Sequence, residues 1–209
     1  MKKRGFKIIL TIILLGIIVG IGRYGYDIYK QNKLVKHVID EYGFEIAYPK
    51  AYKDVVEKSD DEENKILSNV TVSKSGEQIS EYMQNLKFTE TVKNLKNDVN
   101  GVKLIVEALN IEKTALDLEE ICKRYVVMFR IYNEEKPIRE TNSEIINING
   151  IEIGKVEIKV KGEKEDSILI AYLISLEDKE ITITFVGRDS MVNKNEKEIN
   201  RIINSLKIY

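Results

Sequence analysis

The residue types that most often carry out chemistry are scarce in this chain. It has 209 residues with one histidine, His37, and one cysteine, Cys122. A structural zinc site draws its four ligands mainly from these two types, and a nucleophilic cysteine needs a histidine held beside it. His37 lies among charged residues of a predicted helix, and Cys122 lies on an apolar helix stripe. We therefore expect no catalytic residue, no metal ligand and no cofactor-binding residue.

Acidic side chains are the remaining candidates for chemistry. Residues 60–63 are four consecutive acids, whereas a calcium loop alternates its ligands and contains a glycine at its sharp turn. This run therefore favours a solvated loop. Carboxylates paired for glycoside hydrolysis stay open as an alternative, because two acids that meet in space cannot be recognised among 34 in a sequence. The chain contains neither a phosphate-binding glycine loop nor a Gly-x-Ser-x-Gly motif.

The charge balance argues against nucleic acid as a partner. Of the 33 basic residues, five flank an apolar segment near the N-terminus, which leaves 28 against 34 acids. The remainder of the chain thus carries a net charge of about −6. Nucleic-acid-binding domains need a basic surface, which this balance does not provide.

That N-terminal apolar segment predicts a membrane anchor. Residues 8–22 are apolar except for Thr11 and follow a basic tail, residues 1–7. The positive-inside rule keeps such a tail in the cytoplasm and places the following domain outside the cell membrane. As a helix the segment would span about 22 Å, less than the ~30 Å hydrocarbon core, so flanking residues are expected at the interfaces. These residues are Lys7, Arg23, Tyr24, Tyr26 and Tyr29.

Two small-residue patterns in this segment leave further interpretations open. Gly20-Ile21-Gly22 has the small-x-small form of a signal-peptidase site, so a cleaved, secreted protein is the alternative to a retained anchor. Gly16 and Gly20 have the spacing that lets two membrane helices approach closely, which makes them a possible helix-dimer face.

Hydrophobic periodicity predicts a helical stalk over residues 23–42 and one domain over residues 43–209. The domain should begin with a strand in which Phe44, Ile46 and Tyr48 alternate with other residues. Residues 66–73 predict a strand and residues 77–96 a helix, while 102–111 favours a strand with helix as the alternative. Thr114 is a candidate N-cap for a helix whose apolar stripe contains Leu118, Ile121, Cys122, Tyr125 and Phe129.

The C-terminal part predicts an antiparallel meander of four strands. Asn149-Gly150 is the dipeptide preferred in a two-residue hairpin, and Gly154 is placed where the apolar phase shifts, as in a β-bulge. Residues 167–176 are apolar on both faces, which indicates a central strand covered on both sides. A last helix, which begins at Asn193 or Asn195, would carry Ile199, Ile202, Ile203 and Leu206. We expect an α+β fold in which helices cover both faces of the sheet.

Tyrosine is common, with 11 residues against 5 phenylalanines. Outside the membrane segment, we expect these tyrosines at the rim of the core, where the ring is buried and the hydroxyl finds a partner. A binding face is the alternative. The tyrosines concerned are Tyr48, Tyr52, Tyr82, Tyr132 and Tyr172.

The domain resembles the PsbP-like domains, whose fold is shared with a nuclear factor that binds the small GTPase Ran. The matching motifs are YGFEIAYP at 42–49, INGI at 148–151, TITF at 182–185 and INSLKI at 203–208. The resemblance implies the family's α+β sandwich and an accessory or binding role without a shared catalytic residue. It transfers no functional residue to this chain. Together with the anchor, it predicts a non-catalytic extracytoplasmic protein that binds a protein or envelope component; an envelope hydrolase is the alternative.

Overall fold

The computed structural model describes residues 32–55, 90–110, 117–133, 137–177 and 179–209. The predicted membrane segment with its interface residues and glycine pair, the acidic run and the strand predicted over 66–73 lie outside these ranges. Within the described ranges, no helix has both the length and the apolar character needed to cross a membrane.

The fold is α+β, built on a seven-stranded antiparallel main sheet with strand order β3-β4-β5-β9-β8-β7-β6. Its last four strands follow one another along the chain and form the predicted meander, which is confirmed. The strands are β3 (Tyr52–Asp54), β4 (Glu90–Asn97), β5 (Lys103–Asn110), β6 (Ile138–Ile148), β7 (Ile151–Val160), β8 (Ser167–Ser175) and β9 (Lys179–Arg188).

A second, small sheet has the order β1-β2-β10 and contains both ends of the described domain. Its strands are β1 (Leu34–Ile39), β2 (Phe44–Pro49) and β10 (Lys207–Ile208), and the short 3-10 helix η1 (Asp40–Tyr42) joins the first two. Gly43 follows η1 with φ 60°, a left-handed conformation that glycine adopts without a steric penalty. The strand predicted from Phe44 to Pro49 is confirmed.

The helical stalk predicted over residues 23–42 is wrong for the part that the structure describes. Leu34–Ile39 is a strand, hydrogen-bonded to β2 from Leu34 opposite Pro49 to Ile39 opposite Phe44. Its sequence, LVKHVI, contains three β-branched residues, which fit a pleated strand better than a helix. The apolar spacing suited both structures, and pairing with β2 decided between them.

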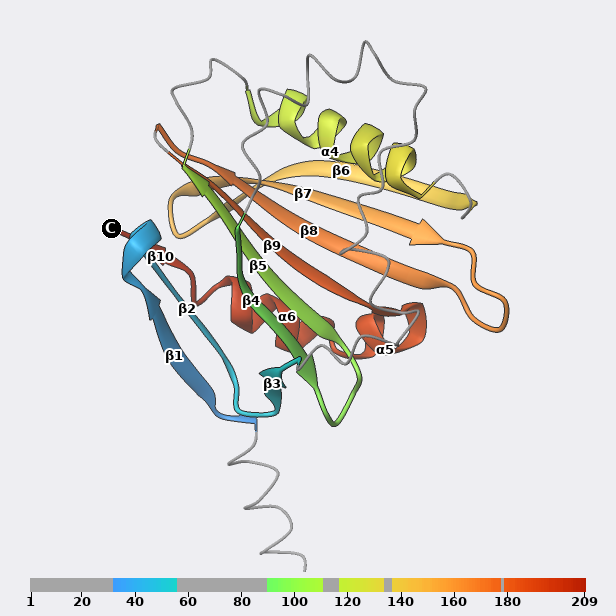
Figure 1. Ribbon diagram of the computed structural model, residues 1–209, viewed down its shortest axis with the longest axis horizontal. Coiled ribbons are helices and arrows are strands. Elements are labelled where there is room, and N and C mark those ends of the chain that lie inside the picture. Colours follow the sequence, from blue (N-terminus) through green and yellow to red (C-terminus); the bar gives the residue numbers. More distant parts are fainter. Residues whose placement is uncertain (1–31, 56–89, 111–116, 134–136, 178) are drawn as a thin grey trace, which may run out of the picture.

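Two helical layers cover the main sheet, one on each face (Figure 1). On one face lies α4 (Leu118–Tyr132), and we call this the α4 face. On the other lie α5 (Asp189–Lys194), α6 (Glu196–Ile203) and the small sheet, and we call this the α6 face. Asp117 caps α4 by accepting a hydrogen bond from the backbone N–H of Glu120 at 2.7 Å, a role that we had predicted for Thr114.

The prediction for β8 is confirmed, because alternate residues of this strand pack into two separate cores. Ile168, Ile170, Tyr172 and Ile174 belong to the core of the α6 face. Leu169, Ala171 and Leu173 belong to the core of the α4 face, where they pack with Cys122 and Phe129 of the helix. The strand is thus central and buried on both sides.

The helix predicted over residues 77–96 is wrong from Glu90 onward, where the chain forms β4. Its apolar residues, Val92 and Leu95, are three apart, which suggested helical spacing. The pairing of β4 with β5 shifts register between Thr91 and Lys93, and this irregularity lets Val92 and Leu95 both pack on the α6-face core. The strand predicted over 102–111 is confirmed as β5.

The bulge predicted at Gly154 is also wrong. The register of β7 runs unbroken through Gly154, which lies opposite Ile145 on β6 and Leu173 on β8. The apolar phase shifts because Ile153 packs in the α6-face core, whereas Val156 packs in the α4-face core. A Cβ atom at Gly154 would overlap the Cys122 sulfur, so the glycine lets α4 approach the sheet closely.

The hairpin predicted at Asn149-Gly150 is confirmed, with φ angles of 55° and 86° at the two turn residues. The Asn149 side chain has a second role, because its amide donates hydrogen bonds to the carbonyls of Asn204 at 3.0 Å and Leu206 at 3.1 Å. The hairpin therefore holds the segment that leads from α6 into β10. Helix α6 begins after Asn195, which is one of the two predicted starting points.

Candidate binding cleft

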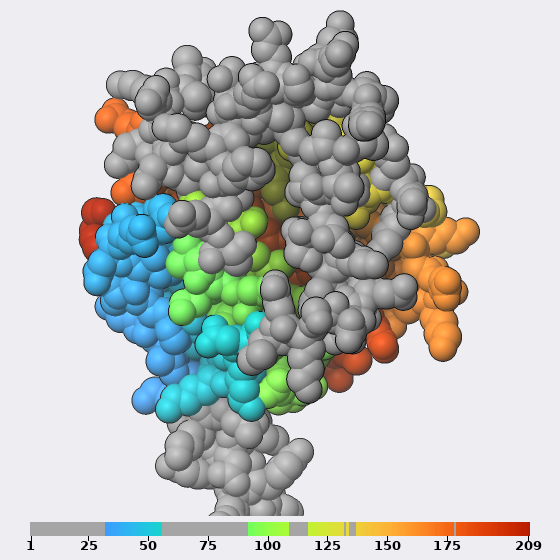
Figure 2. Space-filling view, viewed as in Figure 1, coloured from blue at the N-terminus to red at the C-terminus, as the bar shows by residue number. Residues whose placement is uncertain are grey.

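A cleft of about 410 Å³ opens between the small sheet and the β3–β4 edge of the main sheet. Figure 2 shows the elements that border it, β1–β2, β3 and β4, adjoining one another at one side of the molecule. The cleft is lined by Val35, His37, Tyr48, Lys50, Tyr52, Lys53, Asp54, Lys93 and Leu95.

The local sequence explains why these side chains converge. Alternation along β1 turns Val35 and His37 inward, toward the cleft, and leaves Lys36 and Val38 exposed. Pro49 ends β2, and the chain then passes directly from the small sheet into β3 of the main sheet at Tyr52. This short connection fixes one corner of the cleft, with β1 on one side and β3–β4 on the other.

Three rings form an ordered wall in the cleft. The His37 imidazole stacks on the Tyr48 ring with centroids 3.9 Å apart and planes only 2° from parallel. Tyr52 meets Tyr48 edge to face, with centroids 6.2 Å apart. Both tyrosines are only 4% exposed. Burial, and to a lesser extent the charge of Asp54, raises the pKa of Tyr48 to about 12, so its phenol stays protonated at neutral pH.

The charges around the rings are predominantly positive. Lys50, Lys53 and Lys93 line the cleft with one acid, Asp54. Burial lowers the pKa of His37 below its ordinary value of 6.5, the Lys93 charge lowers it further, and Asp54 opposes them. The imidazole is therefore neutral at pH 7, and the lining carries a net charge of +2, opposite in sign to the domain around it.

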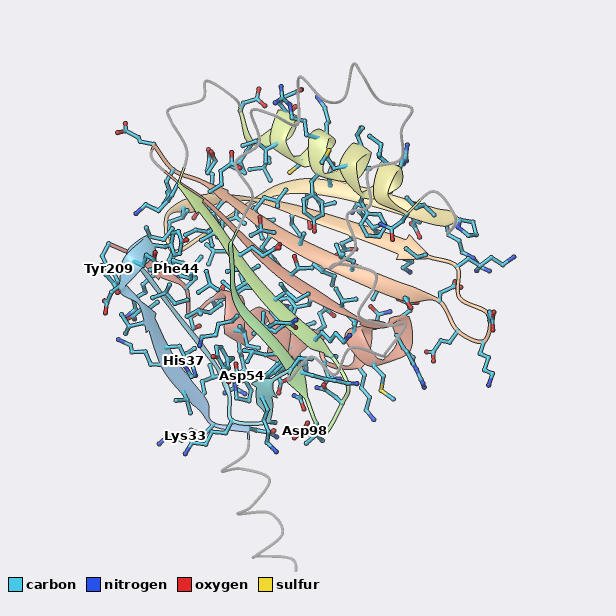
Figure 3. All side chains as sticks on the ribbon, in the orientation of Figure 1. Lys33, His37, Phe44, Asp54, Asp98 and Tyr209 are labelled. Atoms are coloured by element: carbon cyan, nitrogen blue, oxygen red, sulfur yellow. The ribbon has the colours of Figure 1, made fainter. Side chains whose placement is uncertain are left out.

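One of these lysines also forms an ion pair with an acid at the cleft's outer edge. Lys53 forms an ion pair with Asp98 at 2.6 Å, and both side chains are more than half exposed. Figure 3 shows His37, Asp54, Asp98 and Lys33 at the same end of the domain, while Phe44 and Tyr209 lie at the opposite end of the small sheet. The cleft is therefore close to the point where the described chain begins.

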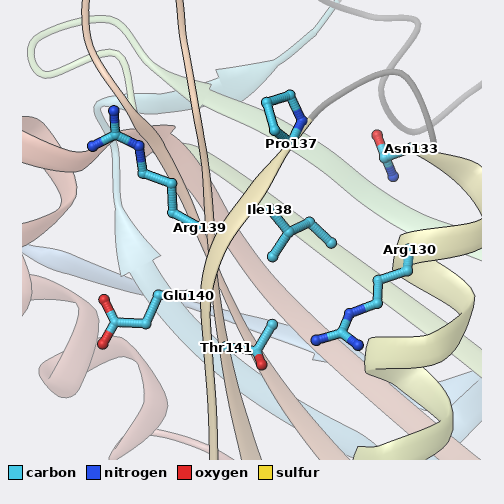
Figure 4. Close-up of a pocket in the computed structure, with 7 residues that line it drawn as sticks. All are labelled: Arg130, Asn133, Pro137, Ile138, Arg139, Glu140 and Thr141. Atoms are coloured by element: carbon cyan, nitrogen blue, oxygen red, sulfur yellow. The ribbon is translucent and has the colours of Figure 1, made fainter.

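A second hollow, of about 360 Å³, lies between the end of α4 and the start of β6 (Figure 4). Its lining includes Arg130 and Asn133 of the helix and residues 137–141. Ile138 points toward the helix, whereas Arg139 and Glu140 extend from the other side of the strand, where Arg139 pairs with Asp166 at 2.8 Å. Its charged groups do not converge, so we regard the His37 cleft as the better candidate.

Two half-buried carboxyl groups, those of Glu107 and Glu180, are relevant to the hydrolase alternative. Glu107 on β5 lies opposite Thr182, and Glu180 is two residues from Thr182 on β9, so the two acids are diagonal neighbours on one face. Burial raises the pKa of both, and Arg124 partly offsets this at Glu180. Neither pKa is raised by the other carboxyl group. The mutual shift that would mark an acid–base pair is thus not a feature of these two residues.

Most residues singled out in the sequence occupy structural positions. Cys122 is buried on the α4 stripe as expected, and burial with the nearby charge of Glu119 raises the pKa of its thiol, which makes it unreactive. Tyr48, Tyr52 and Tyr172 are buried, as predicted for the core. The Tyr52 hydroxyl, however, lacks the hydrogen-bond partner that we expected among the described residues, and Tyr48 and Tyr52 also line the cleft. In the described ranges, no three His, Cys, Asp or Glu side chains gather as a metal site would require.

The prediction for His37 is wrong, and because of it the cleft was not predicted from the sequence. We expected a solvated helical residue, whereas His37 is a half-buried strand residue stacked on a tyrosine. A signal was present, because Val35, His37 and Ile39 alternate with polar or exposed positions at the period of a strand. The competing helical spacing of Leu34, Val35, Val38 and Ile39 obscured it.

Solved structures show the fold to be PsbP-like. The cyanobacterial PsbP protein CyanoP from Synechocystis matches with a TM-score of 0.56 and 13% identity, over 85% of this chain and 94% of that one. A structure from Bacteroides thetaiotaomicron matches with a TM-score of 0.50 and 9% identity, over 86% of this chain and 49% of that one. At such identities the likeness shows the fold alone. No protein-family model matches the sequence, and no curated protein is significantly similar to it.

Proposed function

We propose that this chain is a non-catalytic accessory protein of the cell envelope. A basic tail and membrane anchor hold it at the cell membrane, and the PsbP-like domain lies outside, where it binds a protein or envelope component. The observation that carries the binding role is the His37 cleft, in which rigid rings and excess positive charge converge. The basic tail and apolar segment, residues 1–22, support the location.

The location is tested by adding protease to intact cells whose wall has been removed. We expect the domain to be degraded while a cytoplasmic control protein survives. A domain that persists until the membrane is lysed would contradict the proposal.

The N-terminal mass of the purified protein separates the two versions of this proposal. A retained Met1 or Lys2 end supports the anchor, because cleavage removes the whole apolar segment. A mature chain that begins at Arg23 would show instead that the protein is secreted without an anchor.

A further inference from the structure

We propose that the His37 cleft binds a phosphate ester. Lys50, Lys53 and Lys93 would surround the phosphate, and the His37–Tyr48 stack would contact the organic body of the ligand. This inference rests on the binding role proposed above and specifies the chemistry of the ligand.

The cleft is more positive than its surroundings. Three lysines and one aspartate line it, in a domain where acids outnumber bases. Asp54 and Asp98, the ion-pair partner of Lys53, offset two of the three positive charges, and a bound anion would neutralise the one that remains. Lys93 is the most informative of the three, because it is half-buried on β4 and its charge reaches the His37 imidazole.

All the cations that line the cleft are lysines. A lysine ammonium acts as a point charge and is a common ligand of phosphate in proteins. Lys50 lies in the turn before β3, Lys53 on β3 and Lys93 on β4, so they can approach a tetrahedral phosphate, with its several oxygens, from different directions.

A rigid wall of aromatic rings lies beside the lysines. The stacked His37 and Tyr48 rings leave the half-buried imidazole lining the hollow, where an apolar or sugar-like body can rest against it. Because Tyr52 braces Tyr48 from the side, binding costs little side-chain ordering. The volume of about 410 Å³ accommodates such a group.

Two sources can supply this chemistry, a phospholipid headgroup or a soluble phosphate ester. The cleft lies near Lys33, at the end of the domain where the chain arrives from the predicted anchor. Lys33 is 11 residues after Gly22, a stretch that extends at most about 40 Å, so a retained anchor would keep the cleft within reach of lipid headgroups.

The test uses the full chain in uncharged detergent, with His37 as the reporter. Because the chain has one histidine, the NMR signals of its imidazole are free of overlap. Glycerol 3-phosphate and short-chain phosphatidylglycerol are titrated separately at constant pH and ionic strength, with glycerol as the uncharged control. We expect a saturable shift of the His37 signals with phosphate ester and none with glycerol.

Comparing the two titrations identifies the source of the phosphate. Binding of phosphatidylglycerol at much lower concentration than glycerol 3-phosphate supports a lipid headgroup, and the reverse order supports a soluble ester. If neither probe moves the His37 signals up to about 50 mM, a concentration at which a Kd as weak as about 30 mM would be visible, the proposal is overturned. That failure would leave the protease result, and so the proposed location, unchanged.

Three lysine variants show whether the effect belongs to the cleft. Lys93→Gln and Lys50→Gln should each weaken binding about tenfold, whereas Lys164→Gln, in the exposed β7–β8 turn, should leave it unchanged. Lys93→Gln should also raise the pKa of His37 in the free protein. Because unfolding would raise this pKa too, an unchanged circular dichroism spectrum is what verifies that the variant keeps its fold. Equal binding by all four proteins would contradict the proposed site.

Discussion

The two faces of the main sheet are covered in different ways. On the α4 face, a single helix brings Cys122 and Phe129 onto a small core that includes Val156, Ile158 and Leu169. On the α6 face, α6 and a second sheet built from both ends of the domain enclose a much larger core, whose fully buried side chains include Phe44, Ile46, Phe185, Ile199 and Ile202.

This difference explains where the candidate site lies. Both coverings leave a hollow of similar volume, about 360 Å³ at the end of α4 and about 410 Å³ beside the small sheet. The first is bordered by one helix end and one strand, and its charged groups do not converge. The small sheet shares a core with the main sheet and joins it at Lys50 and Ala51, and beside this crossing side chains from β1, β2, β3 and β4 line a single hollow.

The strongest test of the comparison removes a phenylalanine from each face. Phe44, 0% exposed, is enclosed by elements joined on several sides, so Phe44→Ala should leave a cavity and cost about 4–5 kcal/mol of unfolding free energy. Phe129 is 8% exposed and belongs to α4, a single helix that can shift toward the sheet, so Phe129→Ala should cost about 3 kcal/mol. Chemical denaturation measures both, and an equal or reversed order would contradict the comparison.

A second test concerns the close contact between α4 and the sheet. Gly154→Ala places a methyl group against the Cys122 sulfur and 3.1 Å from the Leu118 side chain, and should destabilise the protein by about 1–3 kcal/mol. Cys122→Ala in the same chain should recover part of this loss, because it removes the overlapping atom. A double-mutant cycle measures the coupling. Strictly additive effects would show that the two residues do not limit the approach of the helix.

The smallest expected effect is electrostatic and concerns the small sheet. Glu45 on β2 pairs with Lys36 of β1 at 2.6 Å and with Lys207 of β10 at 3.3 Å, and so connects all three strands. The hydrogen bond from Lys36 is the main reason that the pKa of Glu45 is lowered from 4.5. A lowered pKa in the folded state stabilises the protein above pH 4.5, and this contribution is lost as the pH falls further.

Glu45→Gln should therefore lower the melting temperature at pH 7 and have progressively less effect below pH 4.5. The exposed Glu152, exchanged for Gln in the same way, provides the control. The interpretation fails if the difference between wild type and Glu45→Gln is the same at pH 3 and pH 7.

Local patterns predicted the C-terminal half of the domain well. The Asn149-Gly150 turn, the two-faced strand β8 and the α4 stripe depend on neighbours in sequence or on the period of a single element. Such features are decided by backbone sterics and by which side of an element is apolar. They were therefore visible before any partner strand was known.

The N-terminal part was predicted less well because its structure depends on distant partners. The spacing of Val92 and Leu95 suggested a helix. Only the irregular pairing of β4 with β5 shows how a strand can place both residues on the same face. The candidate site was missed for the same reason. The lining residues come from three stretches separated in sequence, 35–37, 48–54 and 93–95, and no motif connects His37 with Lys93.

By itself, the sequence determined which segments alternate, where the chain turns tightly and how charge is distributed, since these properties need only adjacent residues. Tertiary structure alone decided that residues 34–39 pair as a strand and that His37 stacks on Tyr48 beside three lysines. It also decided that Gly154 forms no bulge and instead lets α4 approach the sheet closely. The physical reason is that hydrogen-bond pairing between strands and packing between layers join residues whose separation in sequence carries no local signal.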